Sequence, residues 1–314
     1  MDVRYRIALV GYTGYVGQVL HALLMQHDRM DPVVIQARDP SSGGVDECEG
    51  ADVVVLATPA DAARVWTPAL RAAGHRVLDC SDAHRQIDGV HYGLPELFGP
   101  PPASADLVAN PGCYPTASLL ALRPLLQGGC IEPTGIAIAG SSGTSGAGKG
   151  LRDDLHFSAL FGNVFPYKVG EHRHTPEISL HLGAPVAFVP TLLPIVRGML
   201  VTAFVRPTKD PSALLAVLRE AYEPHPWVSV LPAPGANLGV LHAVGTHQAL
   251  IAVGPVEHSG VVPVFCAIDN LLRGAASLAL HNLNLWLSLP VDLGMPPPRA
   301  DLPVSPPPMT RLSP

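Results

Sequence analysis

Short apolar runs alternate with amphipathic stretches through the first third of the chain. Residues 7–10 form an apolar run that ends at a glycine, and four apolar residues recur behind it at helical spacing: Val16, Leu20, Leu23 and Leu24. Further continuous apolar runs follow at residues 32–37, 51–59 and 75–81, and residues 60–74 have the pattern of a helix. Buried strands that alternate with helices predict a doubly wound parallel sheet of the Rossmann type.

The pattern changes after Cys113. Residues 115–126 keep helical spacing, but longer strand-like runs then follow with few helices between them, at 134–142, 186–196 and 198–205. A mixed or antiparallel sheet is predicted there. Residues 267–289 predict a long helix with Asp269 and Asn270 as candidates for its N-cap. The predicted fold class is α/β, a Rossmann-type sheet followed by an α+β domain.

Composition narrows the class of protein. The chain has 314 residues, of which 47% are apolar and 15% charged, so it can bury two domains or one large α/β unit. A net charge of -6 without a long basic run argues against nucleic acid or an anionic membrane as partner. No apolar segment approaches the length of a membrane helix. The proline-rich stretch 290–314 is expected to lie on the surface as an extended tail.

The N-terminus and the cysteines bear on location. The chain enters its first strand without a cationic, apolar leader. Its five cysteines are odd in number and widely scattered, which favours reduced thiols over a disulfide framework. We therefore expect a cytoplasmic protein.

A glycine loop follows the first strand. Gly11, Gly14 and Gly17 have the spacing G-x-x-G-x-x-G and stand where the next helix opens. Glycines let the backbone approach a pyrophosphate, whose charge is stabilised by the helix N-terminus. The alternative is a tight turn without a ligand.

The choice of dinucleotide depends on the end of the second strand. Enzymes that use NAD place an acidic residue there for the ribose hydroxyl. This chain has Arg38 and no carboxylate before Asp39, which favours the additional phosphate of NADP. Arg38 could also be an ordinary solvated loop residue.

Cys113 stands in the segment "NPGCYPT" (residues 110–116), after a predicted strand and turn and before a predicted helix that Pro115 helps to start. A helix N-terminus stabilises a thiolate and lowers the pKa of the thiol, so Cys113 is a candidate nucleophile. Buried cysteines are more often inert, and the other four are interpreted in that way: Cys48, Cys80, Cys130 and Cys266.

A nucleophilic thiol needs an acid or base, and the segment "HRHTPEI" offers His172, His174 and Glu177. A metal pair ranks below acid/base use because no third ligand is evident nearby, so no metal is expected. A solvated polar turn is the other alternative.

A loop of small and hydroxyl residues, 139–150, follows a strand directly and suits an anion or a flat ring, although its composition also fits a linker.

Together these segments resemble the N-acetyl-gamma-glutamyl-phosphate reductases, the arginine-biosynthesis branch of the aspartate-semialdehyde and glyceraldehyde-phosphate dehydrogenase type. The resemblance covers most of the chain, and its most specific parts are the cysteine segment and "HRHTPEI". Its other parts are "GYTGYVG" (11–17), "YGLPEL" (92–97), "SSGTSGAG" (141–148), "VRGMLVT" (196–202) and "AIDNLLRGAASLALHNLN" (267–284).

The resemblance implies NADPH-dependent reduction of N-acetyl-L-glutamyl 5-phosphate to the 5-semialdehyde, through a thioester on Cys113. His172, the stronger candidate, or His174 would be the acid/base, and Glu177 would orient one of them. The implied cofactor-binding residues are Gly11, Thr13, Gly14, Tyr15, Val16, Gly17, Arg38, Ser142, Gly143, Ser145, Gly146 and Asn282. The implied substrate-binding residues are Asn110, Tyr167 and Arg197, the last because a guanidinium matches an anionic fork.

The same resemblance divides the chain. Residues 1–112 would bind NADP, and a C-terminal helix at about 282–314 would pack back on them. Residues 113–281 would form the catalytic and oligomerisation domain of a homodimer or homotetramer. One segment departs from the family, which carries "DLSADFR" where this chain has Asp79-Cys-Ser-Asp-Ala-His-Arg85. The segment between the second and third strands is also short.

Three other functions are compatible with parts of the sequence. A lysine-pathway reductase that acts on a carrier-bound aminoadipyl phosphate resembles the chain overall, but it tends to lack the two prolines around the cysteine. A nucleotide-sensing regulator without catalysis and a thiol hydrolase without nicotinamide are more distant alternatives. The combination of thiol, histidines and glycine loop argues against both.

Overall fold

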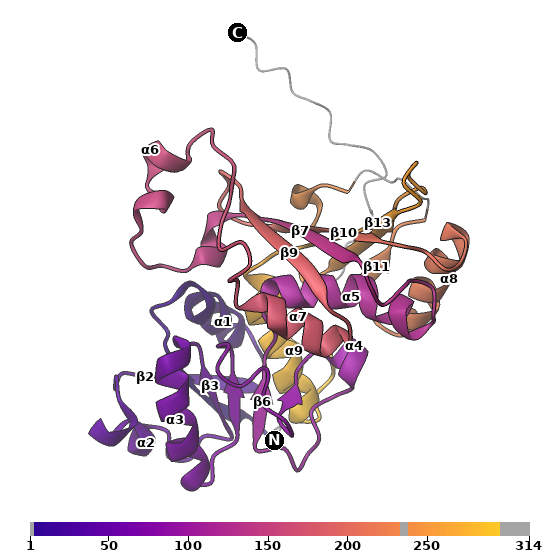
Figure 1. The fold of residues 1–314 in the computed structure, drawn as a ribbon. Helices are drawn as coiled ribbons and strands as arrows, with labels where there is room; N and C mark the ends of the chain where they lie inside the picture. Colours follow the sequence, from indigo (N-terminus) through magenta and orange to yellow (C-terminus); the bar gives the residue numbers. More distant parts are fainter. Residues whose placement is uncertain (1–2, 233–237, 296–314) are drawn as a thin grey trace. The chain divides into compact units, whose positions relative to one another are not determined.

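A computed structural model describes residues 3–232 and 238–295, which form two compact units (Figure 1). The described parts of the first unit are residues 3–116, 144–159 and 270–295. Those of the second unit are 117–143, 160–232 and 238–269. The boundary near residue 116 falls within helix α5 (Cys113–Gln127), whose first residues belong to the first unit.

The first unit contains a sheet of six parallel strands in the order β2-β1-β3-β4-β6-β5. The strands are β1 (Tyr5–Val10), β2 (Met30–Ile35), β3 (Val53–Leu56), β4 (Val77–Asp79), β5 (His91–Tyr92) and β6 (Leu107–Ala109). The helices between them are α1 (Tyr15–Met25), η1 (Pro40–Ser42), α2 (Gly44–Glu47), α3 (Ala60–Ala72) and α4 (Pro95–Phe98). This order confirms the doubly wound parallel sheet that the apolar runs predict.

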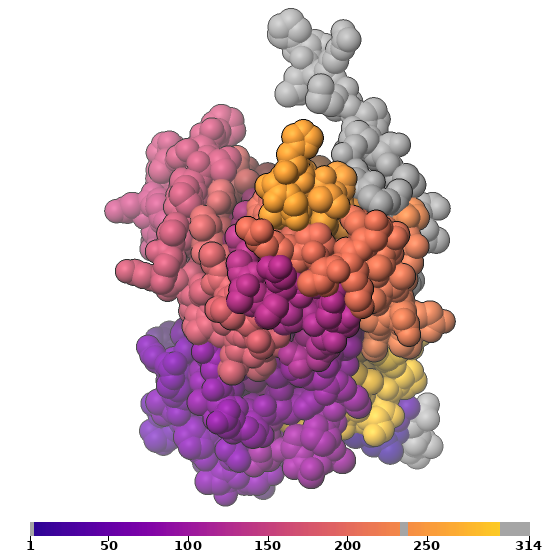
Figure 2. Space-filling view, turned by 45° about the vertical axis from the view of Figure 1, so that its right-hand side comes forward, coloured from indigo at the N-terminus to yellow at the C-terminus, as the bar shows by residue number. Residues whose placement is uncertain are grey.

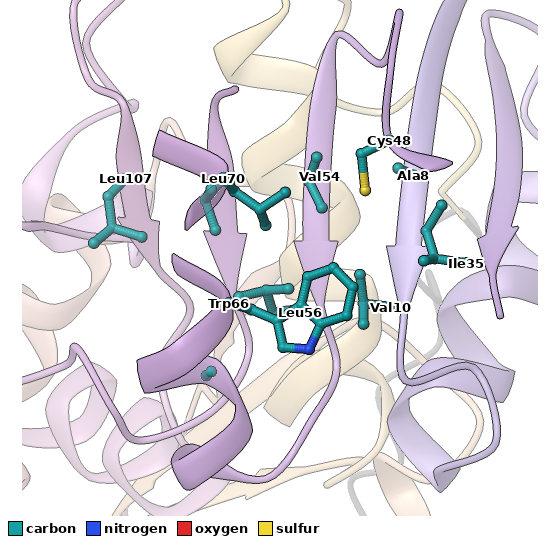
Figure 3. Packing of buried hydrophobic residues seen from close by; sticks show 11 residues of the cluster. Ala8, Val10, Ile35, Cys48, Val54, Leu56, Trp66, Leu70 and Leu107 are labelled. Atoms are coloured by element: carbon teal, nitrogen blue, oxygen red, sulfur yellow. The ribbon is translucent and has the colours of Figure 1, made fainter. Parts of the chain in front are cut away.

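Helices cover both faces of this sheet. Trp66 and Leu70 of α3 lie against one face, on side chains that include Val54 and Leu56 (Figure 3). The pale yellow C-terminal helix lies behind the strands in the same view. It packs beside α1, and Figure 2 shows the yellow C-terminal segment next to the indigo and purple N-terminal part of the chain. The central strands β3, β4 and β6 are accordingly buried at every residue, on both faces of the sheet.

The C-terminal part of the first unit consists of a π-helical turn, η5 (Leu272–Ala276), that continues into α9 (Ser277–Trp286). The long helix predicted over residues 267–289 is therefore observed over residues 272–286, so it starts before residue 282, where the C-terminal packing helix was expected to start. The last part of the expected helix and tail, 296–314, lies outside the described residues. Asp269 and Asn270 precede the first helical residue and its cap, Leu271, so neither caps the helix.

A buried ion pair joins this C-terminal segment to α4. Arg273 Nη2 lies 2.6 Å from Glu96 Oε1, and both side chains are inaccessible to solvent. Burial alone raises the pKa of the Glu96 carboxyl, but the charges of Arg273 and His281 outweigh it and hold the pKa at about 2. Glu96 therefore stays ionised, and its ion pair with Arg273 holds η5 against α4.

The second unit contains a mixed sheet in the order β11-β12-β13-β10-β7-β9-β8. Its strands are β7 (Ile136–Ser142), β8 (Phe165–Pro166), β9 (Val186–Leu192), β10 (Met199–Val205), β11 (Val228–Val230), β12 (Ala249–Val253) and β13 (Val262–Ile268). The pairs β7–β9 and β11–β12 are parallel, and the other pairs are antiparallel, which confirms the predicted mixed sheet.

Helices α7 (His174–Leu182) and α8 (Pro211–Tyr222) and the short η4 (Val240–His242) accompany this sheet. Three short helices lie in the segment after β7: η2 (Thr144–Ala147), η3 (Asp153–Leu155) and α6 (Phe157–Leu160). In the two described ranges, no helix combines the length and the apolar character that crossing a membrane requires.

Candidate functional site

Cys113 is the first residue of α5. The carbonyl oxygen of Gly112 accepts hydrogen bonds from the Thr116 amide (2.9 Å) and hydroxyl (2.8 Å), which close the first helical turn. From residue 107 to residue 122 every residue is buried except Cys113, which is partly exposed. The thiol therefore lies at a helix N-terminus, where backbone N–H groups and the helix dipole favour a thiolate.

The other thiols have different surroundings. Burial raises the pKa of Cys48 to about 11 and that of Cys80 to about 12, in both cases assisted by a neighbouring carboxylate. Both thiols are thus protonated at neutral pH. Cys130 and Cys266 are buried. None of the five cysteines, all of which are described, forms a disulfide.

The segment before the thiol is held by the first unit. The backbone N–H of Asn110 donates a hydrogen bond to the backbone carbonyl of Asp79, at the end of β4 (2.8 Å). The Arg85 guanidinium donates to the carbonyls of Asn110 and Cys80, each at 2.8 Å. Sequence reasoning missed the role of Arg85, because nothing in the local pattern says which carbonyl a guanidinium will reach.

Asn110 is also held through its side chain. Asn282 Nδ2 donates to Asn110 Oδ1 (3.1 Å) and to the Gly93 carbonyl (2.8 Å), and Asn110 Nδ2 donates to the Ala275 carbonyl (3.2 Å). Asn110 is 1% exposed and Asn282 is inaccessible. A Cβ at Gly93 would lie 2.6 Å from Asn282 Nδ2, so this position requires glycine. The substrate and cofactor roles of the two asparagines stay predictions.

Replacing Asn282 with alanine is expected to lower the free energy of unfolding by about 2 kcal/mol, because it leaves the buried Gly93 carbonyl and Asn110 amide oxygen without donors. Urea unfolding followed by circular dichroism measures the change. Asn163→Ala, on an exposed loop residue, is the control and should change stability by less than about 0.5 kcal/mol. Equal stability of wild type and Asn282→Ala would show that the network contributes nothing.

The segment that departs from the family pattern forms a compact turn. Asp79 is inaccessible, and its carboxylate accepts hydrogen bonds from the Ser81 amide (2.8 Å) and hydroxyl (2.9 Å). It also lies 2.7 Å from His84 Nδ1. His84 stands where the family has phenylalanine, and here it pairs with Asp79. The turn thus carries Arg85 to Asn110 despite its different sequence.

The glycine loop has the geometry that a dinucleotide requires. Gly11 has a φ of 89°, in the left-handed region, and its carbonyl accepts the Gly14 amide at 3.1 Å. A Cβ on Gly17 would overlap the Gly11 carbonyl oxygen. Helix α1 begins at Tyr15 with no side-chain cap, so its first N–H groups remain for an anion. Thr13 and Tyr15 are exposed, Val16 is half-buried, and the loop fits a bound pyrophosphate.

The structure brings part of the small-residue loop to this place. Lys149 Nζ donates to the Thr13 carbonyl (3.3 Å), so residues near 149 lie beside the glycine loop within the first unit. Asn270 was expected to cap the C-terminal helix, but its Nδ2 instead donates a hydrogen bond to Ser145 Oγ (2.9 Å). Gly146 belongs to the same unit.

Ser142 and Gly143 belong to the second unit. Ser142 is the last residue of β7, and the Gly143 amide donates to the Gly198 carbonyl at 2.9 Å. A Cβ on Gly143 would lie 2.7 Å from the Val196 carbonyl oxygen, so the close approach of the two backbones requires glycine.

The end of β2 differs from the sequence-based picture. The strand ends at Ile35, and Arg38 is exposed, with no side-chain hydrogen bond or ion pair among the described residues. The Asp39 carboxylate caps η1, where it accepts hydrogen bonds from the Ser41 hydroxyl (2.5 Å) and backbone N–H (2.8 Å). These hydrogen bonds lower the pKa of Asp39. A carboxylate from farther along the chain, Glu47, lies at this strand end, which local sequence did not reveal.

The histidines lie in the second unit, at the start of α7. His172 Nδ1 accepts a hydrogen bond from the His174 amide (3.1 Å). The neutral His172 ring must then carry its proton on Nε2, because a neutral imidazole has one donor and one acceptor nitrogen. The rings of Tyr167, His174 and Phe188 meet the His172 ring edge to face at 5.5, 4.8 and 5.3 Å. These contacts fix the orientation of the imidazole.

Glu177 is inaccessible and lies in the first turn of α7, and both histidines are buried. Its predicted role as the residue that orients a histidine stays a prediction. Within the described ranges, no group of three or more His, Cys, Asp and Glu side chains has the arrangement of a metal site.

Arg197 is held by one buried carboxylate. Its Nη2 lies 3.1 Å from Asp269 Oδ1, and the other Asp269 oxygen accepts the Gly245 amide at 2.9 Å. Asp269 is therefore a positioning partner of Arg197 and no helix cap. The Arg197 Nε atom is buried and has no hydrogen-bond partner among the described residues. The Arg197 side chain as a whole is 32% exposed, so other parts of its guanidinium can meet an incoming anion.

Two family models match the chain. Residues 44–102 match the semialdehyde dehydrogenase NAD binding domain, and residues 113–270 match the semialdehyde dehydrogenase dimerisation domain.

Curated relatives match over nearly the full length. An N-acetyl-gamma-glutamyl-phosphate reductase of Desulforudis audaxviator is 36% identical over 92% of this chain and 97% of its own length. Proteins of the same name from Thermosynechococcus vestitus and Brevibacillus brevis are 33% and 32% identical, over 94% and 93% of this chain and 98% of their own lengths.

Solved structures share the fold. Aspartate semialdehyde dehydrogenase II of Vibrio cholerae, complexed with ASA, superposes with a TM-score of 0.72 at 16% identity, over 91% of this chain and 98% of that one. The aspartate semialdehyde dehydrogenase of Candida albicans with NADP gives 0.67 at 16% identity, over 88% and 96%.

Proposed function

Because the chain belongs to the N-acetyl-gamma-glutamyl-phosphate reductase family, we propose that it reduces N-acetyl-L-glutamyl 5-phosphate to N-acetyl-L-glutamate 5-semialdehyde in arginine biosynthesis. NADPH is the reductant and inorganic phosphate the second product. The observation that carries the proposal is Cys113, a partly exposed thiol at the first residue of α5, flanked on both sides by buried residues.

Cys113 is the nucleophile. Its thiolate attacks the carbonyl carbon of the acyl phosphate, a C–S bond forms, the C–O bond to phosphate breaks, and phosphate leaves. The nicotinamide, when bound, supplies the hydride that reduces this thioester to a thiohemiacetal. Collapse of the thiohemiacetal breaks the C–S bond, forms the aldehyde and returns the thiolate. Capture on sulfur divides one difficult reduction into two easier steps.

His172 is the acid in this proposal. Because Nδ1 accepts the backbone N–H of His174, the neutral ring carries its proton on Nε2, and this N–H is the group that protonates an oxygen of the substrate. On collapse of the thiohemiacetal the same nitrogen accepts the proton back. Glu177 and the surrounding rings orient the imidazole.

The cofactor residues follow from the glycine loop. The uncapped first N–H groups of α1, which begins at Tyr15, bind the pyrophosphate, and Arg38 binds the 2′-phosphate of NADPH. Ser142, Gly143, Ser145 and Gly146 line the nicotinamide and the leaving phosphate. Lys149, held beside the Thr13 carbonyl, adds positive charge near the pyrophosphate.

Arg197 anchors an anionic group of the substrate through its partly exposed guanidinium. Arg197→Ala should therefore raise the KM for the acyl phosphate about 10- to 100-fold with a smaller change in kcat, since an ionic hydrogen bond contributes about 1.5–3 kcal/mol. Steady-state kinetics measures the split, and Arg206→Ala, on an exposed arginine of the same unit, is the matched control. An unchanged KM and kcat in Arg197→Ala would contradict the anchor.

Assembly and location complete the proposal. The match of residues 113–270 to a dimerisation domain supports a homodimer or homotetramer, which light scattering after gel filtration measures. The absence of disulfides among the described cysteines is consistent with a reducing cytoplasm.

The reverse reaction tests the function. The purified protein should reduce NADP⁺ in the presence of N-acetylglutamate semialdehyde and inorganic phosphate, and omission of phosphate should stop the reaction. A comparison of N-acetylglutamyl phosphate with aminoadipyl phosphate in the forward direction tests the substrate. Faster turnover of the aminoadipyl compound would refute the arginine-pathway assignment.

A further inference from the structure

The side chain of Glu47, which lies twelve residues after the end of β2, binds the backbone at that strand end. It is the last residue of α2, and its Oε2 accepts hydrogen bonds from the backbone amides of Gln36 (2.8 Å) and Ala37 (3.4 Å). These are the first two amides after the strand, which ends at Ile35. A carboxylate therefore lies at the place where dinucleotide-binding folds recognise the adenosine ribose.

The fold fixes this position. Helix α2 packs against α3 so closely that a Cβ on Gly44 would overlap the Trp66 ring and lie 2.8 Å from the Asp39 carbonyl oxygen. Gly43, just before α2, has a φ of 87°, which lets the chain turn sharply there. Cys48, just after it, is buried in the same core (Figure 3). The close packing of Gly44 against Trp66 thus places Glu47 at the end of β2.

Two charges of opposite sign meet at this strand end. Arg38 is exposed, and its guanidinium makes no hydrogen bond among the described residues, so it is available for a phosphate. Asp39 faces Ser41 and caps η1. Of these two carboxylates, Glu47 is the one that accepts hydrogen bonds from the backbone amides of Gln36 and Ala37.

We infer that Glu47 opposes the 2′-phosphate and limits the preference of this protein for NADPH over NADH. Its negative charge repels the phosphate and occupies backbone donors that the phosphate would use, while the same carboxylate can accept hydrogen bonds from the ribose hydroxyls of NADH. Arg38 and Glu47 thus act in opposite directions on one choice. The inference rests on the proposed binding of nicotinamide dinucleotide by the first unit.

Direct binding tests it without turnover. The dissociation constants of NADPH and NADH are measured by titrating each reduced nucleotide with protein and following its fluorescence. Glu47→Gln keeps the size of the side chain and removes the charge, and Glu47→Ala removes the carboxylate altogether. Both variants should bind NADPH about fivefold more tightly, since removal of one exposed charge changes the binding free energy by up to about 1 kcal/mol. Their affinity for NADH should weaken or change by less than about twofold.

Asp46→Asn is the matched control, because it removes the same charge from the adjacent exposed residue of α2. The ratio of the two dissociation constants should stay at the wild-type value in this variant. The gain in Glu47→Gln should also shrink as ionic strength rises. Circular dichroism melting of each variant verifies that it is folded.

Two results overturn the inference: an unchanged ratio in folded Glu47→Gln and Glu47→Ala, or an equal shift in Asp46→Asn. If the wild-type protein binds neither nucleotide, the proposed function fails as well. Binding of both nucleotides with no response to Glu47 would leave the proposed function standing and remove only the role of Glu47.

Discussion

Turnover of N-acetylglutamyl phosphate falls at least about 10⁴-fold in Cys113→Ser. A hydroxyl at the first residue of α5 is far less acidic than a thiol, so the helix N-terminus that favours a thiolate has no comparable effect on serine. In a serine protease, loss of the nucleophile lowers kcat about 10⁶-fold, and the residual rate comes from the oxyanion hole and substrate binding. Stopped-flow or steady-state assays of NADPH oxidation measure the loss.

The control for this experiment is Cys80→Ser. Cys80 belongs to the same unit, but its thiol has a pKa of about 12 and is protonated at neutral pH. This variant should keep kcat within about threefold of the wild type. NADPH affinity should be unchanged in Cys113→Ser, which separates loss of chemistry from loss of folding. Turnover above about 1% of the wild type in Cys113→Ser would exclude the covalent route.

The second large effect is expected at His172. Replacement by asparagine should lower kcat about 10²- to 10⁴-fold, because general acid catalysis contributes an amount of this size and an amide cannot donate a proton to a substrate oxygen. The variant should also lose the limb of the pH profile that the imidazole contributes. Formation of the acyl enzyme before reduction should be affected less than the reduction itself.

Two further histidines make this test specific. His181 lies on the same helix, α7, and His181→Asn should keep nearly full activity. His174→Asn should have an intermediate effect, since it keeps the backbone N–H that donates to His172 but removes the ring that packs against the His172 ring. If His174→Asn were more damaging than His172→Asn, and if only the former altered the pH profile, the roles of the two histidines would be exchanged.

Local periodicity predicted the elements that bury a continuous apolar run. The strands β1, β3 and β4 and the helices α1 and α3 follow directly from such runs, because each buries a face set by its own residue spacing. The thiol at a helix start was also predictable, since proline and helical spacing after Cys113 are local signals. The same holds for the glycine loop.

Contacts between distant segments could not be predicted in this way. The bond from Asn282 to Asn110 joins residues 172 positions apart, and no local pattern pairs them. Asp269 looked like a helix cap by position, but Arg197 and Gly245 bind its carboxylate, so the helix begins later. The sequence near Arg38 suggested a strand end without an available carboxylate, whereas the packing of Gly44 on Trp66 brings Glu47 there.

Mass spectrometry of the intact protein after mixing with N-acetylglutamyl phosphate in the absence of NADPH tests the central claim most directly. The account predicts a mass increase of one N-acetylglutamyl group, located on Cys113 by peptide mapping, removed by hydroxylamine, and discharged as the semialdehyde when NADPH is added. An unmodified Cys113 in a protein that turns over the same substrate would contradict it.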